Sequence, residues 1–148
     1  MNIYRHSVTF NAPIKFVYDW CTDYREDDPQ ITGATYRRII LEKSKRRVIF
    51  ASEKKGFDGL PKIAVRILTL SPKDFSWHLD YFSEEDLEHG DYKLKKIGKD
   101  ITRLDMIFRN KWKKGGGPTK EQLHAETEGS WNGYGPALDR DYANFGNQ

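Results

Sequence analysis

The sequence predicts an α+β fold in which a curved, mostly antiparallel sheet of about seven strands wraps round a long C-terminal helix. Two observations lead to this prediction. Between residues 34 and 113, short runs that alternate between apolar and polar side chains are separated by turn residues, which is typical of antiparallel strands. After a glycine-rich break at 115–118, apolar side chains recur every three or four residues, which is typical of an amphipathic helix.

Length and composition favour one globular domain spanning residues 1–148. The chain has 148 residues, of which 37% are hydrophobic and 32% are charged, so it can bury a core and keep a well-solvated surface. Aromatic residues make up 14% of the chain. That much aromatic surface requires an interior or a binding site to occupy.

The first elements are a strand over 2–10 and a short helix pair. The strand places four side chains on one face: Tyr4, His6, Val8 and Phe10. Asn11 is expected to cap the helix that follows, and Pro13 suits its first turn. Phe16, Val17, Trp20 and Cys21 recur at helical spacing, so Cys21 is expected to be a buried packing thiol. Asp28-Pro29 ends the helix.

A meander of strands follows. In one strand, Trp77, Leu79 and Tyr81 alternate with polar residues that include His78, which predicts that His78 faces water. In the last strand the apolar face includes Asn110. The predicted strands are 34–42, 46–53, 62–70, 74–82, 87–97 and 101–112.

The final segment is predicted to be one long helix with an interruption. Thr119 and Gln122 have the spacing of a capping box, which marks the helix start. The apolar stripe consists of Leu123, Thr127, Trp131, Tyr134, Leu138, Tyr142 and Phe145. Interior glycines and Pro136 disfavour helix, so a kink or split is expected near 132–137.

Charge and cysteine content exclude several classes of function. The net charge is +3, and the basic residues that crowd Arg37–Lys55 are interleaved with acidic ones, so a solvated face with cross-strand ion pairs is expected and nucleic-acid binding is not. This basic face could still meet an anionic ligand or a protein partner. With one cysteine, no signal peptide and no apolar run of about 18 residues, we expect a cytoplasmic protein without a membrane span.

The order of a strand, a short helix pair, about six strands and a long helix, together with the segment HSVTFNAPIKFVYDWCTDY (6–24), resembles the START-like or SRPBCC superfamily. That superfamily includes birch-pollen-allergen type proteins, polyketide cyclases and aromatases, and lipid-transfer domains. The resemblance implies a helix-grip fold with an apolar cavity between sheet and helix. It implies no shared catalytic motif, so no catalytic residue is carried over and no cofactor is expected.

The candidate site is this apolar interior, where each side chain alone would be read as core. Tyrosine hydroxyls in it could supply the polar groups that orient a ligand. The predicted ligand contacts are Phe50, Val65, Ile67, Trp77, Leu79, Tyr81, Tyr92, Leu94, Leu104, Met106, Phe108, Trp131, Tyr134 and Leu138.

The favoured function is binding or transport of a hydrophobic small molecule, such as a lipid, an isoprenoid or a polyketide-like compound. One alternative is a cyclase, aromatase or dehydratase, in which Tyr81, Tyr134 or His6 moves a proton. Another is a protein-binding module, similar to a chaperone cofactor, that uses the basic face. No metal site is expected, because the acidic cluster of Asp23, Glu26, Asp27 and Asp28 lacks the glycine and terminal glutamate of an EF-hand.

Overall fold

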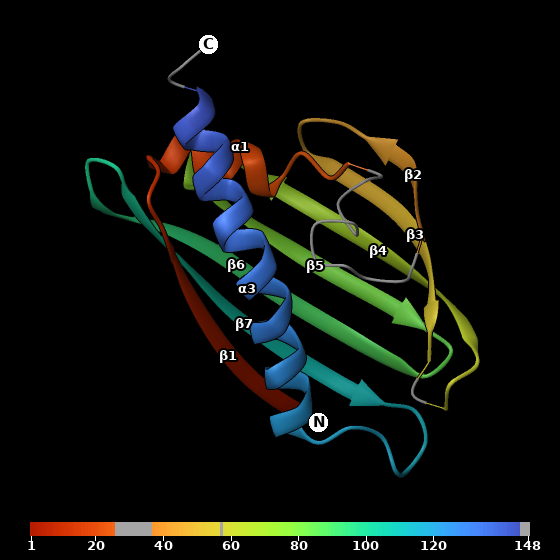
Figure 1. Ribbon diagram of the computed structural model, residues 1–148. Coiled ribbons are helices and arrows are strands. Elements are labelled where there is room, and N and C mark those ends of the chain that lie inside the picture. Colours follow the sequence, from red (N-terminus) through yellow and green to blue (C-terminus); the bar gives the residue numbers. More distant parts are fainter. Residues whose placement is uncertain (26–36, 57, 146–148) are drawn as a thin grey trace.

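The fold is that of a computed structural model, which describes residues 1–25, 37–56 and 58–145. Seven strands form one antiparallel sheet in the order β1-β7-β6-β5-β4-β3-β2 (Figure 1). The strands are β1 (Asn2–Phe10), β2 (Arg37–Lys43), β3 (Arg47–Lys55), β4 (Pro61–Ser71), β5 (Ser76–Ser83), β6 (Asp86–Gly98) and β7 (Ile101–Trp112). The predicted α+β fold is therefore confirmed.

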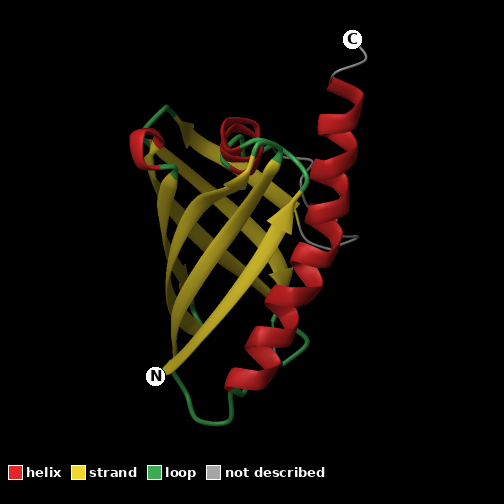
Figure 2. Ribbon diagram, turned by 90° about the vertical axis from the view of Figure 1, so that its left-hand side faces the viewer, coloured by secondary structure: helices red, strands yellow, loops and turns green. Residues whose placement is uncertain are grey.

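Two helices complete the described structure, together with a single 3₁₀ turn at Pro72–Asp74. The long helix α3 (Lys120–Phe145) runs along the open side of the curved sheet, and the short helix α1 (Ile14–Cys21) lies at one end of it (Figure 2). This arrangement is the predicted helix grip. The second short helix, the first residues of strand 34–42 and most of the acidic cluster fall within 26–36, outside the described residues.

Alternation decides which side chains enter the interior. Along β7, Leu104, Met106, Phe108 and Asn110 are buried, whereas the residues between them are half-exposed. The predicted phase of this strand, including the inward position of Asn110, is confirmed. The described helices contain no stretch that is both long and apolar enough to cross a membrane.

The phase predicted for β4 is wrong. Val65 pairs with Ala51 and Phe82, on the outer face of the sheet, and Ile67 shares that face. Their neighbours Arg66 and Leu68 point inward instead. The segment IAVRIL has apolar side chains on both faces, so hydrophobicity alone could not fix which face points inward.

Asn11 does not cap α1. Pro13 occupies the N-cap position of the helix, and no side chain within the described ranges caps it. The Asn11 backbone N–H and side-chain amide instead donate to Asp139 at 3.0 and 3.4 Å, which ties the end of β1 to α3. The sequence could not reveal this role because the two residues are far apart along the chain.

The start of α3 is confirmed. Of the kink or split expected near 132–137, the split is wrong, because the helix is continuous there. The Thr119 N–H donates to Gln122 Oε1 at 2.8 Å, and the Gln122 N–H donates to Thr119 Oγ1 at 3.2 Å, which is the predicted capping box. The helix then continues through Pro136 to Phe145. Pro136 and Asn132 are exposed, so water can reach the carbonyl that the proline leaves without a donor. Gly135, which is buried, lies against Val8 on β1.

Candidate functional site

A cavity of about 550 Å³ lies between the inner face of the sheet and α3. Its volume falls within the usual range for small-molecule sites. Side chains reach it from β1, α1, the strands of the sheet and the first half of α3. Its aromatic lining consists of Tyr4, Trp20, Tyr24, Phe50, Trp77, Tyr81, Tyr92, Phe108, Trp112, Trp131 and Tyr134.

The structure brings more than half of the predicted ligand contacts together in this lining: Phe50, Trp77, Leu79, Tyr81, Tyr92, Phe108, Trp131 and Tyr134. Leu94, Leu104, Met106 and Leu138 are buried in the core but do not line the cavity. Val65 and Ile67 lie on the outer face, as described above. Contact of the lining residues with a ligand remains a prediction.

Stacked rings form one wall of the cavity. Tyr92 lies nearly parallel to Trp77, with the ring centroids 4.9 Å apart, and meets Phe108 edge to face at 5.5 Å. Phe108 also stacks on Tyr4 at 5.0 Å. Such pairs add about 0.5–1.5 kcal/mol each beyond the burial of their area, so this wall is a rigid surface.

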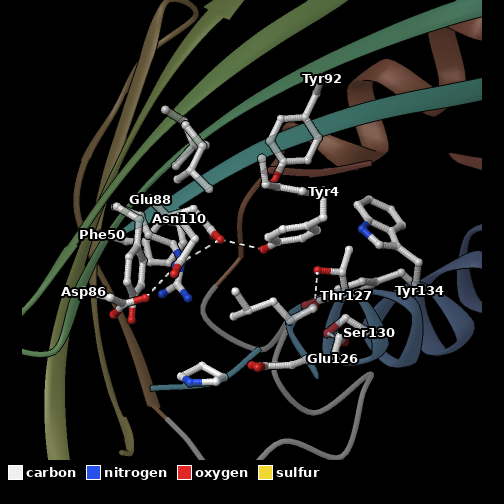
Figure 3. Close-up of a pocket in the computed structure, with 18 of the residues that line it drawn as sticks. Tyr4, Phe50, Asp86, Glu88, Tyr92, Asn110, Glu126, Thr127, Ser130 and Tyr134 are labelled. Atoms are coloured by element: carbon white, nitrogen blue, oxygen red, sulfur yellow. Dashed lines mark hydrogen bonds between the residues drawn. The ribbon is translucent and has the colours of Figure 1, made fainter. Parts of the chain in front are cut away.

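A hydrogen-bonded polar cluster lies among the aromatic rings of the lining (Figure 3). The Tyr4 hydroxyl donates to Glu88 Oε1 at 2.5 Å, from the opposite side of β7. The Asn110 amide donates to Asp86 Oδ2 at 2.8 Å and to Glu88 Oε1 at 3.4 Å. The Asp86 carboxylate is fixed by a further hydrogen bond, because the Ser83 hydroxyl donates to Asp86 Oδ1 at 2.7 Å.

Burial controls the protonation of this cluster. Burial raises the pKa of Glu88, and the nearby charge of Asp86 raises it further, whereas the hydrogen bond from Tyr4 and the charge of Arg66 oppose the rise. The pKa of the Tyr4 phenol is raised, mainly by burial and then by the charge of Glu88. Tyr4 therefore stays protonated and acts as a donor, while the raised pKa of Glu88 makes this carboxyl a candidate to hold or release a proton.

Two arginines reach the cavity. The Arg66 guanidinium donates to Ser52 Oγ at 2.7 Å and lies 4.7 Å from the centre of the Tyr81 ring. The Arg38 guanidinium lies 4.3 Å from the centre of the Phe50 ring. The sequence pattern groups Arg38 with the solvated basic face, but this residue lines the cavity. Both cations are thus held against aromatic faces beside the apolar space.

Sequence reasoning missed Glu88 and Arg66 as cavity residues and treated Tyr4 and Asn110 as parts of strand patterns. The signals were present. Glu88 has the same parity in β6 as the predicted inward residue Tyr92, and Asn110 falls on the apolar face of its strand. A polar side chain at an inward position indicates a placed hydrogen-bonding group.

The other residues considered from the sequence lie elsewhere or differ in exposure. His6 is absent from the cavity lining; its ring meets that of His124 edge to face at 5.4 Å. Cys21, expected to be buried packing, is half-exposed and lines the cavity. His78 faces outward, as predicted.

Cross-strand ion pairs on the basic face are confirmed. Arg47 Nη2 lies 3.0 Å from a Glu42 carboxylate oxygen, and Arg37 Nη2 lies 3.9 Å from Glu53. All four side chains are at least two-fifths exposed, so each pair contributes little to stability. A protein partner for this face remains a prediction.

No known protein family and no curated protein matches the chain by sequence. Solved structures do match. The Zhui aromatase/cyclase from Streptomyces sp. R1128 has a TM-score of 0.75 at 16% identity, over 96% of this chain and 93% of that chain. A START superfamily protein from Mycobacterium smegmatis has a TM-score of 0.76 at 12% identity, over 95% and 99%. Ara h 8.0201 has a TM-score of 0.66 at 14% identity, over 97% and 98%.

These matches cover nearly the whole chain. Because the sequence identities are low, the matches show a shared fold. The chain therefore shares the helix-grip fold of these structures, one of which is a START superfamily protein, and it has a cavity between its sheet and C-terminal helix. The proteins that share this fold thus include an aromatase/cyclase and a START superfamily protein.

Proposed function

We propose that this protein binds a hydrophobic small molecule, lipid-, isoprenoid- or polyketide-like, in the cavity between the sheet and α3. The observation that carries the proposal is a cavity of about 550 Å³ with walls of aromatic side chains. The structural neighbours support the same class, since they include a START superfamily protein and an aromatase/cyclase.

The polar cluster indicates which chemical groups the ligand carries. Glu88, Tyr4 and Arg66 are grouped on the sheet side of a lining that combines aromatic rings with other polar side chains. A ligand with an apolar body and a polar end can stack on the rings and exchange hydrogen bonds with this group. A purely hydrocarbon ligand would leave the polar groups without a new partner, so we expect a hydroxyl, carbonyl or phenol.

The first test is native mass spectrometry of protein purified without detergent, compared with the same sample after denaturation. We expect a bound mass of a few hundred daltons that is lost on unfolding, or a rise in melting temperature with members of a lipid, isoprenoid and polyketide panel. A ligand-free mass, together with no thermal response across the panel, would contradict the proposal.

Filling the cavity gives a sharper test. Ser130 lines the cavity from α3, whereas Ala125 on the same helix is exposed and does not. We expect Ser130→Trp to occupy ligand space and to weaken binding of any active panel compound at least tenfold. Ala125→Trp adds the same indole outside the cavity, and this control should bind as the native protein does.

The second candidate is an enzyme of the cyclase or aromatase type. The contact that favours it is the 2.5 Å hydrogen bond from Tyr4 to Glu88, whose raised pKa allows it to transfer a proton. A catalytic role predicts that Glu88→Gln abolishes turnover of a bound polyketide-like compound without preventing its binding. If the native protein binds the compound without turning it over, the enzyme function is contradicted and the binding function is supported.

A further inference from the structure

The outer face of the sheet, opposite the cavity, carries a compact group of histidines and aspartates. His78 and Asp80 alternate outward on β5, while Trp77 and Leu79 turn inward. The antiparallel register pairs His78 with Asp91 and Asp80 with His89 on β6. The group therefore stands on two central strands, each hydrogen-bonded on both sides.

Three ligand-type atoms in this group converge. His89 Nδ1 lies 2.6 Å from Asp80 Oδ1, and His78 Nε2 lies 2.9 Å from the same oxygen. The two imidazoles are nearly parallel, with centroids 6.2 Å apart. The three ligand atoms lie within 4.8 Å of one another. Among the residues that the structure describes, no other three His, Cys, Asp or Glu side chains bring their ligand atoms this close together.

A further aspartate fixes the orientation of one imidazole. His78 Nδ1 lies 2.7 Å from Asp91 Oδ1, and Asp91 Oδ2 accepts a hydrogen bond from Arg109 at 3.3 Å. Metal-binding histidines usually donate their second N–H to a carboxylate in this way. With the Nδ1 proton directed at Asp91, a neutral His78 presents its Nε2 lone pair to Asp80. Two lone pairs 2.9 Å apart repel unless a cation, either a proton or a metal ion, lies between them.

We propose that His78, Asp80 and His89 form a binding site for a divalent transition-metal ion such as Zn²⁺, which would join β5 to β6. Two imidazole nitrogens and one carboxylate oxygen suit zinc and its neighbours rather than calcium or magnesium, which prefer oxygen ligands. The side chains are 39%, 30% and 47% exposed, so a fourth position is open to water.

The geometry requires a small adjustment. Ligand atoms about 2.0–2.1 Å from a tetrahedral zinc ion lie about 3.3 Å from each other. The two contacts to Asp80 must therefore open by less than an ångström, and the two imidazole nitrogens, which lie within 4.8 Å of each other, must come to the same spacing. Partly exposed side chains on the outer face of a sheet can make that movement without disturbing the core.

The test is calorimetric titration of Zn²⁺ into the full, tag-free chain after chelator treatment, with Co²⁺ absorption as a report of coordination. We expect one ion per chain, a rise in melting temperature, and loss of both in His89→Ala. Asp91→Asn should bind about 10- to 100-fold more weakly, because it loses the orienting carboxylate. His124→Ala removes a histidine on α3, outside the group, and should bind as the native chain does.

Three results would overturn the proposal: no saturable binding by the native chain, unchanged binding in His89→Ala, or loss of binding in His124→Ala. Circular dichroism of each variant shows whether it folds. If His89→Ala does not fold, Zn²⁺-induced shifts in the NMR spectrum of the native chain decide the question. Shifts confined to amides of β5 and β6 support the site, and shifts elsewhere exclude it.

Discussion

At the scale of single residues, burial and neighbouring groups act in opposite directions on the protonation of Glu88. Its carboxyl is enclosed by β1, β6 and β7 and faces Tyr4, Asp86, Arg66 and Asn110. Burial and the charge of Asp86 favour the protonated form, while the other three neighbours favour the ionised form. The net effect is a raised pKa, so the folded chain holds this proton more tightly than the unfolded chain.

This raised pKa predicts a pH-dependent effect of Glu88→Gln. A carboxyl with a raised folded-state pKa contributes stability below its unfolded pKa and loses that contribution as pH rises through its folded pKa. The free energy of unfolding of Glu88→Gln, relative to the native protein, should therefore increase between pH 4 and pH 8. Each tenfold difference in proton affinity between the folded and unfolded chains adds about 1.4 kcal/mol to this increase, which urea unfolding can measure.

The control for this prediction is Glu126→Gln, at an exposed position of the same cavity lining on α3. Its difference from the native protein should change less over the same pH range. A flat or falling difference for Glu88→Gln would show that the buried carboxyl is not held in its protonated form.

At the scale of elements, what could be predicted depended on how strongly each local pattern constrains the chain. β7 alternates clearly, so its phase followed from the sequence. β4 is apolar on both faces, and the inward Arg66 is compensated by Ser52 and the Tyr81 ring, which lie on other strands. The Glu88 cluster and the His78 group likewise depend on register between strands, which no single strand encodes.

The start of α3 gives a prediction at this scale. Thr119 and Gln122 exchange hydrogen bonds that satisfy two backbone donors at the helix start. Thr119→Ala should lower the free energy of unfolding by about 0.5–2 kcal/mol. Thr119→Ser keeps the hydroxyl and should retain most of the stability in the same denaturant titration. Equal losses in the two variants would show that the hydroxyl does not cap the helix.

At the scale of the whole molecule, the order of elements was enough to predict the fold, because a sheet with one apolar face must cover it with the long amphipathic helix. The cavity could not be derived in the same way. Its volume is the space that side chains from distant strands and α3 fail to fill, and that depends on their packing in three dimensions. The resemblance to a superfamily with cavities supplied the expectation that the residues alone could not.

The same architecture predicts unequal stability across the molecule. The central strands β5, β6 and β7 are hydrogen-bonded on both sides, whereas α3 has a cavity between part of its inner face and the sheet. We expect amide hydrogen exchange to be faster in α3 than in the middle of β6, because α3 can open without breaking the sheet. Such opening would widen access to the cavity, whose lining already includes exposed residues of α3.

A variant tests whether α1 holds the far end of this helix. Trp20 Nε1 donates to Asp141 on α3 at 2.8 Å, and Trp20→Phe removes that bond while keeping an aromatic ring. Exchange should accelerate in the second half of α3 and stay unchanged in β6. Exchange in α3 as slow as in β6, in both the native chain and the variant, would mean that helix and sheet open together and that the cavity does not weaken the contact between them.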